Sequence, residues 1–213
     1  MKELVIIENW KQITLAQYEE ICRLQEQHST EEATPRVIEY LYGVENAEQL
    51  PLPQYMAMVE GLRRLNNNPV ATEKMTPAAT YTVEGRRYDV DLSPTTFTAG
   101  QYIDFTNHLK NKGGLSDLLT VVMIPHDHAY NDGYDMAAVK SDLLTLPASA
   151  AFAVVGFFVR WSAASIRTFL RCLTKWAKRN RKVNREQAER LEKAAAELQH
   201  LLASYPLFSP IAN

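Results

Sequence analysis

The chain has 213 residues, with 23 Lys and Arg against 25 Asp and Glu, and 46% of its residues are hydrophobic. A chain of this length buries roughly 70% of its extended surface on folding, so its stability requires neither disulfides nor a metal. The net charge of −2 excludes a strongly basic nucleic-acid coat or an acidic disordered tail as a description of the whole chain.

A helix start recurs three times in the first half of the chain. Thr14 and Thr98 are each followed three positions later by Gln, which is the spacing of a capping box that satisfies free backbone N–H groups. The middle copy has Pro51 and Pro53 near the first turn instead. With the apolar spacing around them, these starts predict helices over residues 15–26, 35–42 and 53–65, and a further helix from residue 98.

Strand-like patterns are confined to two short places. Residues 4–7 form a β-branched run that fits an edge strand. Residues 79–92 alternate apolar and polar on either side of a Glu-Gly pair, which predicts a β-hairpin. After the helix that starts at residue 98, Ser116 has the position of an N-cap for a short helix that ends at residue 123.

The carboxy-terminal third predicts two long helices. An apolar helical pattern begins at Pro147 and persists to residue 181, and a capping box at Asn184 begins a second helix that runs to residue 204. The tight turn between them implies an antiparallel helical hairpin. The first half of the long helix is apolar all round, so we expect other elements to cover it on several sides.

These elements predict an α+β fold that is mainly α-helical. Its expected parts are a helical N-terminal part over residues 1–68, a β-hairpin with short helices over residues 79–145, and a long helical hairpin with an apolar C-terminal arm over residues 147–213. The three parts are also compatible with one compact domain.

The strongest local pattern is a basic stripe on the long helix. Residues 160–185 contain nine Arg and Lys and no Asp or Glu, whereas residues 1–60 contain eleven acidic residues against four basic ones. Helical spacing places six cations opposite the apolar face of this helix: Arg160, Arg167, Arg171, Lys175, Lys178 and Lys182.

A solvated helix face explains such a run of charge, and so do three kinds of partner. An acidic protein surface, such as the N-terminal part of a neighbouring copy, would be electrostatically complementary. A phosphate backbone is a weaker alternative, because the stripe is short and lacks glycine loops or spaced exposed aromatics. An anionic membrane surface is the third kind of partner and the least favoured, and we expect no membrane insertion, because the apolar side of this helix is needed for the protein's own core.

The apolar carboxy-terminal end is a second candidate contact. Leu207, Phe208 and Ile211 follow Pro206, which stops the preceding helix. This end either docks into a neighbour as an extended arm or folds onto its own core.

One cluster contains side chains of the types that bind metals. His126, Asp127 and His128 precede an Asn-Asp-Gly turn, but their spacing matches no known metal motif, and a polar loop explains the same residues. The sequence also lacks a glycine-rich phosphate loop, a dinucleotide fingerprint and a nucleophile elbow. We therefore assign no metal, no cofactor and no catalytic residue, and expect a binding or assembly protein rather than an enzyme.

Neither cysteines nor targeting signals point to export. Cys22 and Cys172 each lie in an apolar helical pattern, where a lone thiol usually behaves as a small buried hydrophobe. The amino terminus lacks the apolar core of a secretory signal. The most apolar window, residues 146–159, is shorter than the roughly 20 residues of a membrane span. We expect synthesis in a reducing interior.

Three segments carry a resemblance to a known group of proteins. In their general residue pattern and their order, these segments resemble small proteins encoded among the virion genes of tailed bacteriophages, including the crAss-like group. The segments are residues 9–18, residues 100–105 and the loop over residues 124–135. The resemblance implies a neck or tail component, with a tail assembly chaperone as the alternative, and it brings no catalytic residues. Its implied partners are other copies of the chain and neighbouring virion proteins. Its implied location is the host cytoplasm during assembly and then the virion.

Overall fold

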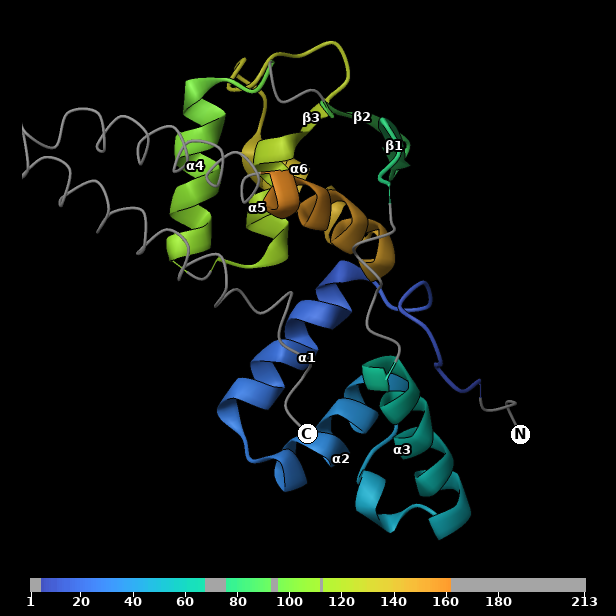
Figure 1. Ribbon diagram of the computed structural model, residues 1–213. Coiled ribbons are helices and arrows are strands. Elements are labelled where there is room, and N and C mark those ends of the chain that lie inside the picture. The colour runs from blue at the N-terminus through green and yellow to red at the C-terminus, as the bar shows by residue number, and fades with distance from the viewer. Residues whose placement is uncertain (1–4, 68–75, 93–95, 112, 162–213) are drawn as a thin grey trace, which may run out of the picture.

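The computed structural model describes residues 5–67, 76–92, 96–111 and 113–161, which form a mainly helical α+β fold (Figure 1). One end contains α1 (Leu15–Gln27), α2 (Thr30–Tyr42), the 3₁₀ turn η1 (Ala47–Gln49) and α3 (Leu52–Asn67). The other end contains α4 (Ala99–Lys110), α5 (Leu115–Val122), α6 (Met136–Leu143) and a sheet of β1 (Thr80–Val83), β2 (Arg86–Val90) and β3 (Met123–Pro125). The coarse fold class is confirmed, and the predicted helical hairpin lies mostly outside the described residues.

Both predicted capping boxes are present. The Thr14 Oγ1 atom accepts a hydrogen bond from the Gln17 N–H at 3.2 Å, and the Gln17 side chain accepts one in return from the Thr14 N–H at 2.9 Å. Thr98 and Gln101 repeat this pair of bonds at the start of α4. Local sequence therefore fixes where these two helices begin.

α2 begins five residues earlier than the predicted start at residue 35. Ser29 is its N-cap and accepts a hydrogen bond from the Glu32 N–H at 3.4 Å. Pro35, which suggested a first turn, is buried inside the helix. Because proline has no backbone N–H, it removes one hydrogen bond from the helix at that position. The predicted end is confirmed, because Gly43 adopts a left-handed conformation with φ of 61°.

The predicted β-hairpin is confirmed, and a third strand extends it. Glu84 and Gly85 have φ of 48° and 76°, the left-handed conformations of a tight hairpin turn. β3 pairs antiparallel with β2, with Val90 opposite Met123. The predicted edge strand over residues 4–7 is wrong for its described part, because residues 5–8 are extended but pair with no strand.

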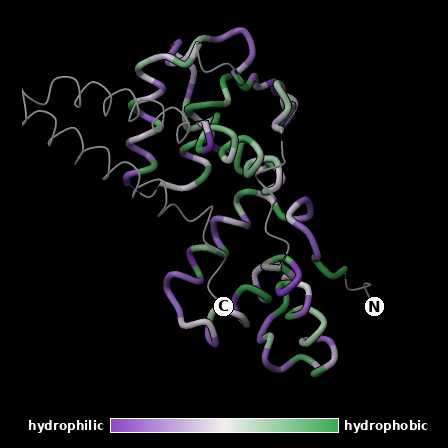
Figure 2. Tube along the Cα trace, in the orientation of Figure 1, coloured by the Kyte–Doolittle hydropathy of each residue, from purple (hydrophilic) through white to green (hydrophobic). Residues whose placement is uncertain are grey.

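The main core surrounds the helical segment 148–161, the most hydrophobic long stretch of the described chain (Figure 2). Phe152, Val154, Val155 and Phe158 are each at most 4% exposed, as expected of a helix covered on several sides. Residues just before α1 hold the first turn of this segment. The Ala148 N–H donates to the Ile13 carbonyl at 2.8 Å, and the Ser149 N–H donates to the Trp10 carbonyl at 3.3 Å.

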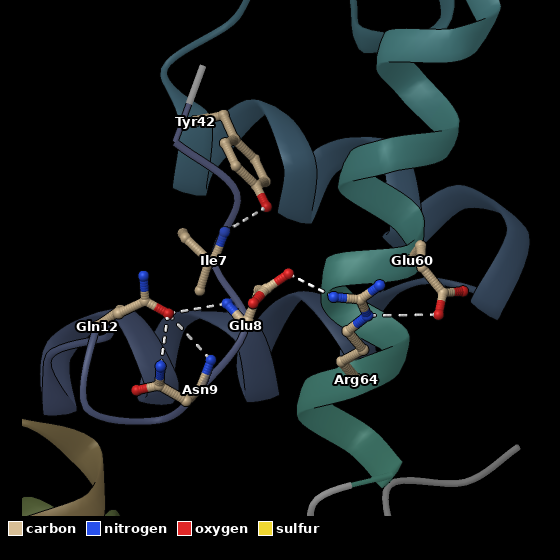
Figure 3. A network of polar contacts seen from close by, with 7 residues as sticks. All are labelled: Ile7, Glu8, Asn9, Gln12, Tyr42, Glu60 and Arg64. Carbon is tan, nitrogen blue, oxygen red and sulfur yellow. Dashed lines mark hydrogen bonds and ion pairs between the residues drawn. The ribbon is translucent and has the colours of Figure 1, made fainter. Parts of the chain in front are cut away.

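A smaller apolar cluster lies between α2, η1 and α3, centred on Ile38, Ala47 and Met58. The extended N-terminal segment closes it from one side (Figure 3). The Ile7 N–H donates to the Tyr42 hydroxyl at 3.2 Å, and the Glu8 carboxylate pairs with Arg64 of α3. None of the described helices is both long enough and apolar enough to cross a membrane.

Candidate functional site

Most residues of the predicted contact sites lie outside the described part of the chain. Arg160 is the exception, and it lies partly buried near the end of the helical segment 148–161. The other members of the basic stripe and the apolar end are outside the described residues: Arg167, Arg171, Lys175, Lys178, Lys182, Leu207, Phe208 and Ile211.

The loop that follows β3 is tied to the sheet through His126. Its ring Nδ1 lies 2.6 Å from Oδ2 of Asp89 on β2, and this hydrogen bond lowers the pKa of the Asp89 carboxyl. The His126 N–H also donates to the Arg87 carbonyl at 2.9 Å, which continues the pairing of β2 and β3 by one residue. Within the described residues, no three His, Cys, Asp or Glu side chains are grouped so as to hold a metal ion.

The same loop is tied to α4 on its other side. The Tyr130 hydroxyl donates a hydrogen bond to Oδ2 of Asp104 at 2.7 Å. Burial and this carboxylate raise the pKa of Tyr130 above its ordinary value. Left-handed conformations at Asn131 and Gly133 turn the chain back toward α6. The loop is thus held by two side-chain hydrogen bonds, one to the sheet and one to α4.

A third carboxylate links the sheet to α6. The Tyr88 hydroxyl of β2 donates to Oδ2 of Asp142 at 2.6 Å, and Arg86 pairs with the same oxygen at 3.2 Å. Burial, and then the contact with Asp142, raise the pKa of Tyr88 to about 12. The carboxylates of Asp89, Asp104 and Asp142 thus each form a hydrogen bond with a side chain from another part of the fold. Each of these bonds connects two separate segments of the chain.

Among the described residues, pairs of exposed large apolar side chains lie on two helices, and Val5 and Tyr40 are exposed singly. On α3, Leu52 is 70% exposed and Met56, one helical turn later, is 53% exposed. On α4, Ile103 is 56% exposed and the neighbouring Tyr102 is 37% exposed. Because α3 and α4 belong to opposite ends of the described fold, these are two distinct apolar surfaces (Figure 1).

Sequence reasoning missed these residues, although a signal for one of them was available. Helical spacing puts Tyr55, Val59 and Leu62 on one side of α3, and these side chains pack against the smaller cluster. Leu52 precedes Tyr55 by three residues and Val59 by seven, so helical spacing places it on the same side, whereas Met56 lies off that side. A large apolar residue away from the core-facing side, here Met56, was the feature to notice.

The surroundings of the α3 surface are acidic. Residues 37–62 contain four Glu and no Lys, Arg or His. Glu39 turns inward and accepts a hydrogen bond from the Ala47 N–H at 3.0 Å, and Glu60 pairs with Arg63 and Arg64. Glu45 and Glu48 are exposed, and no Lys or Arg of the described part of the chain pairs with either.

Comparison with known protein families, with characterised proteins and with solved structures gave no match.

Proposed function

We propose that this chain is a non-enzymatic structural or assembly protein of a tailed phage particle. It acts as a neck, ring or tail component through contacts with other copies of itself and with neighbouring virion proteins. It is made in the host cytoplasm and then enters the virion. The proposal starts from the resemblance of residues 9–18, 100–105 and 124–135 to phage virion-gene products.

The observation that carries the proposal is the presence of two exposed apolar surfaces on different elements. Leu52 and Met56 form one surface on α3, and Tyr102 and Ile103 form the other on α4. A pair of exposed apolar residues on one helix is a candidate contact for another protein. A subunit packed head to tail in a ring has a different surface toward each neighbour, so two unlike surfaces suit such a subunit.

Mass spectrometry of purified particles tests this proposal. We expect the protein to be present at several copies per particle. Its absence from mature particles, together with failed tail formation when its gene is deleted, would favour the alternative of a tail assembly chaperone.

The basic stripe has its own test in particles. We expect a variant with Arg167→Glu, Arg171→Glu and Lys175→Glu to fold but to enter particles poorly. Unchanged incorporation would count against the stripe as a contact surface. Tight binding to double-stranded DNA that weakens steeply with salt would instead favour the alternative of a nucleic-acid-binding protein that uses residues 160–185.

A further inference from the structure

We propose that the α3 surface, made of Leu52, Met56, Glu45 and Glu48, is the docking site for the basic stripe of a second copy of this chain. The inference rests on the proposed assembly function and names the two surfaces that meet. The two surfaces are the exposed α3 surface of the described structure and the basic stripe within residues 160–185, which is the strongest charge pattern of the sequence.

The α3 surface combines apolar and acidic groups in a small space. Leu52 and Met56 are mostly exposed on adjacent turns, and Glu48 precedes Leu52 by four residues. Four residues of chain span at most about 14 Å, which is therefore the largest possible distance between the Cα atoms of Glu48 and Leu52. Glu45 adds a second exposed carboxylate on the same connection between α2 and α3.

Arg and Lys side chains fit this combination better than purely apolar ones. Their aliphatic stems cover apolar surface while their charged ends reach water or a carboxylate. Leu52 and Met56 offer the apolar surface, and Glu45 and Glu48 offer carboxylates that no described Lys or Arg occupies. A partner with several cations in a row along one helix face would satisfy both.

The chain itself contains such a partner segment. Residues 160–185 contain nine Arg and Lys and no acidic residue. The sequence predicts a helix whose apolar side is needed for the protein's own core, and such a helix would leave its cationic side for a neighbour. Opposite charge on the two surfaces would both speed their encounter and fix the direction of packing.

The geometry favours a second copy over the same chain. Trp161, the last described residue, packs against Phe97 beside α4, with ring centroids 5.5 Å apart. The described chain therefore ends beside α4, six residues before Arg167, whereas α3 lies at the other end of the described fold (Figure 1).

Sedimentation velocity of the purified full-length protein, over a range of concentration and salt, tests the inference. We expect the wild-type chain to self-associate, and salt to weaken the association. The double variant Leu52→Asp and Met56→Asp should weaken it by about tenfold or more, as loss of an interface centre does. Because both side chains are exposed, circular dichroism should show an unchanged fold.

Two further sets of variants distinguish loss of the α3 contact from a general effect of added charge on the association. Val5→Asp introduces the same charge at a residue that is 69% exposed and belongs to neither apolar surface, and it should leave the association unchanged. Glu45→Lys with Glu48→Lys should abolish it. Adding Arg167→Glu, Arg171→Glu and Lys175→Glu to that variant should restore it, since both surfaces are then reversed.

Three results would overturn the inference. They are a wild-type chain that stays monomeric at every concentration, an α3 variant that associates like the wild type, and a charge exchange that restores nothing. These outcomes differ from failure of the proposed function. If the protein is found in particles but is monomeric in solution, only the proposed docking contact is contradicted. If it self-associates but plays no part in particle formation, only the proposed function is contradicted.

Discussion

The Glu19 carboxylate on α1 accepts two hydrogen bonds from Ser116 at the first turn of α5. The Ser116 N–H donates at 2.7 Å and the Ser116 hydroxyl donates at 3.1 Å. Ser116 was predicted as the N-cap, but Gly114 occupies that position, and a side chain from α1 satisfies the free N–H instead. A Cβ atom at residue 114 would lie 2.6 Å from Oε1 of Glu19, so a side chain there would push this carboxylate aside.

Removing this carboxylate should destabilise the fold. We expect Glu19→Ala to lower the free energy of unfolding by about 1–3 kcal/mol, because it leaves a partly buried N–H unpaired at a helix N-terminus. Urea unfolding measures the change. Glu20→Ala is the control, since its exposed contact with Arg23 should contribute less than about 1 kcal/mol. Equal losses in the two variants would show that the α1 to α5 contact is no stronger than a surface ion pair.

A side chain at Gly61 should displace the N-terminal segment. A Cβ atom there would lie 2.6 Å from the Ile7 carbonyl oxygen and 2.8 Å from Cγ2 of Ile6. Overpacking of this kind costs about 1–3 kcal/mol, so we expect Gly61→Ala to lower the melting temperature. Faster amide exchange at Ile7 should accompany the change, because the hydrogen bond to Tyr42 would be strained.

Gly100 provides the comparison for that substitution. It lies in the first turn of α4, where a Cβ atom would approach no other atom closer than 3.9 Å. Gly100→Ala should leave stability unchanged or raise it by up to about 1 kcal/mol, because Ala favours the helix. A loss as large as that of Gly61→Ala would contradict the steric explanation.

The aromatic core beside α4 should depend strongly on Phe158. This side chain is 2% exposed and packs against the rings of Phe97, Phe105 and Trp161. We expect Phe158→Ala to cost about 3–5 kcal/mol in thermal or denaturant unfolding. Tyr102→Ala, at an exposed position, should change stability by less than about 0.5 kcal/mol.

Tyr88 should make the fold sensitive to alkaline pH. Its pKa is raised from an ordinary value of 10.0 to about 12, so the folded state holds the phenol proton more tightly than the unfolded state does. This contribution to stability is complete below pH 10 and is lost as the pH rises toward 12. We expect the unfolding free energy of the wild type to fall over that interval and that of Tyr88→Phe to fall less steeply. Parallel pH curves would mean that Tyr88 makes no such contribution.

Local signals in the sequence predicted much of the described fold. The capping boxes at Thr14 and Thr98 lie within four residues of the helices they begin, so no tertiary contact is needed to place them. The Glu84 and Gly85 turn is equally local. The prediction for the start of α2 was wrong because Pro35 gives a stronger local signal for a helix start than Ser29 does. In the structure, Pro35 lies within α2.

Features that depend on distant partners could not be predicted. β3 is three residues long and continues directly from α5, so only its pairing with β2 reveals it. The cap from Glu19 reaches α5 across 97 positions of sequence. Met56 could have been identified from its place off the apolar side of α3, but the exposure of Leu52, which helical spacing puts on the apolar side, depends on contacts with α2 and η1.

The hydrogen bonds from Ala148 and Ser149 to Ile13 and Trp10 have a consequence for biosynthesis. The chain grows from its amino terminus, so the residues before α1 emerge long before the segment that completes their hydrogen bonds. During that interval Trp10, Ile13 and Leu15 lack the central helix that covers them. A ribosome stalled before residue 148 would therefore hold a nascent chain with an uncovered apolar face, a target for chaperones that protect unfinished proteins.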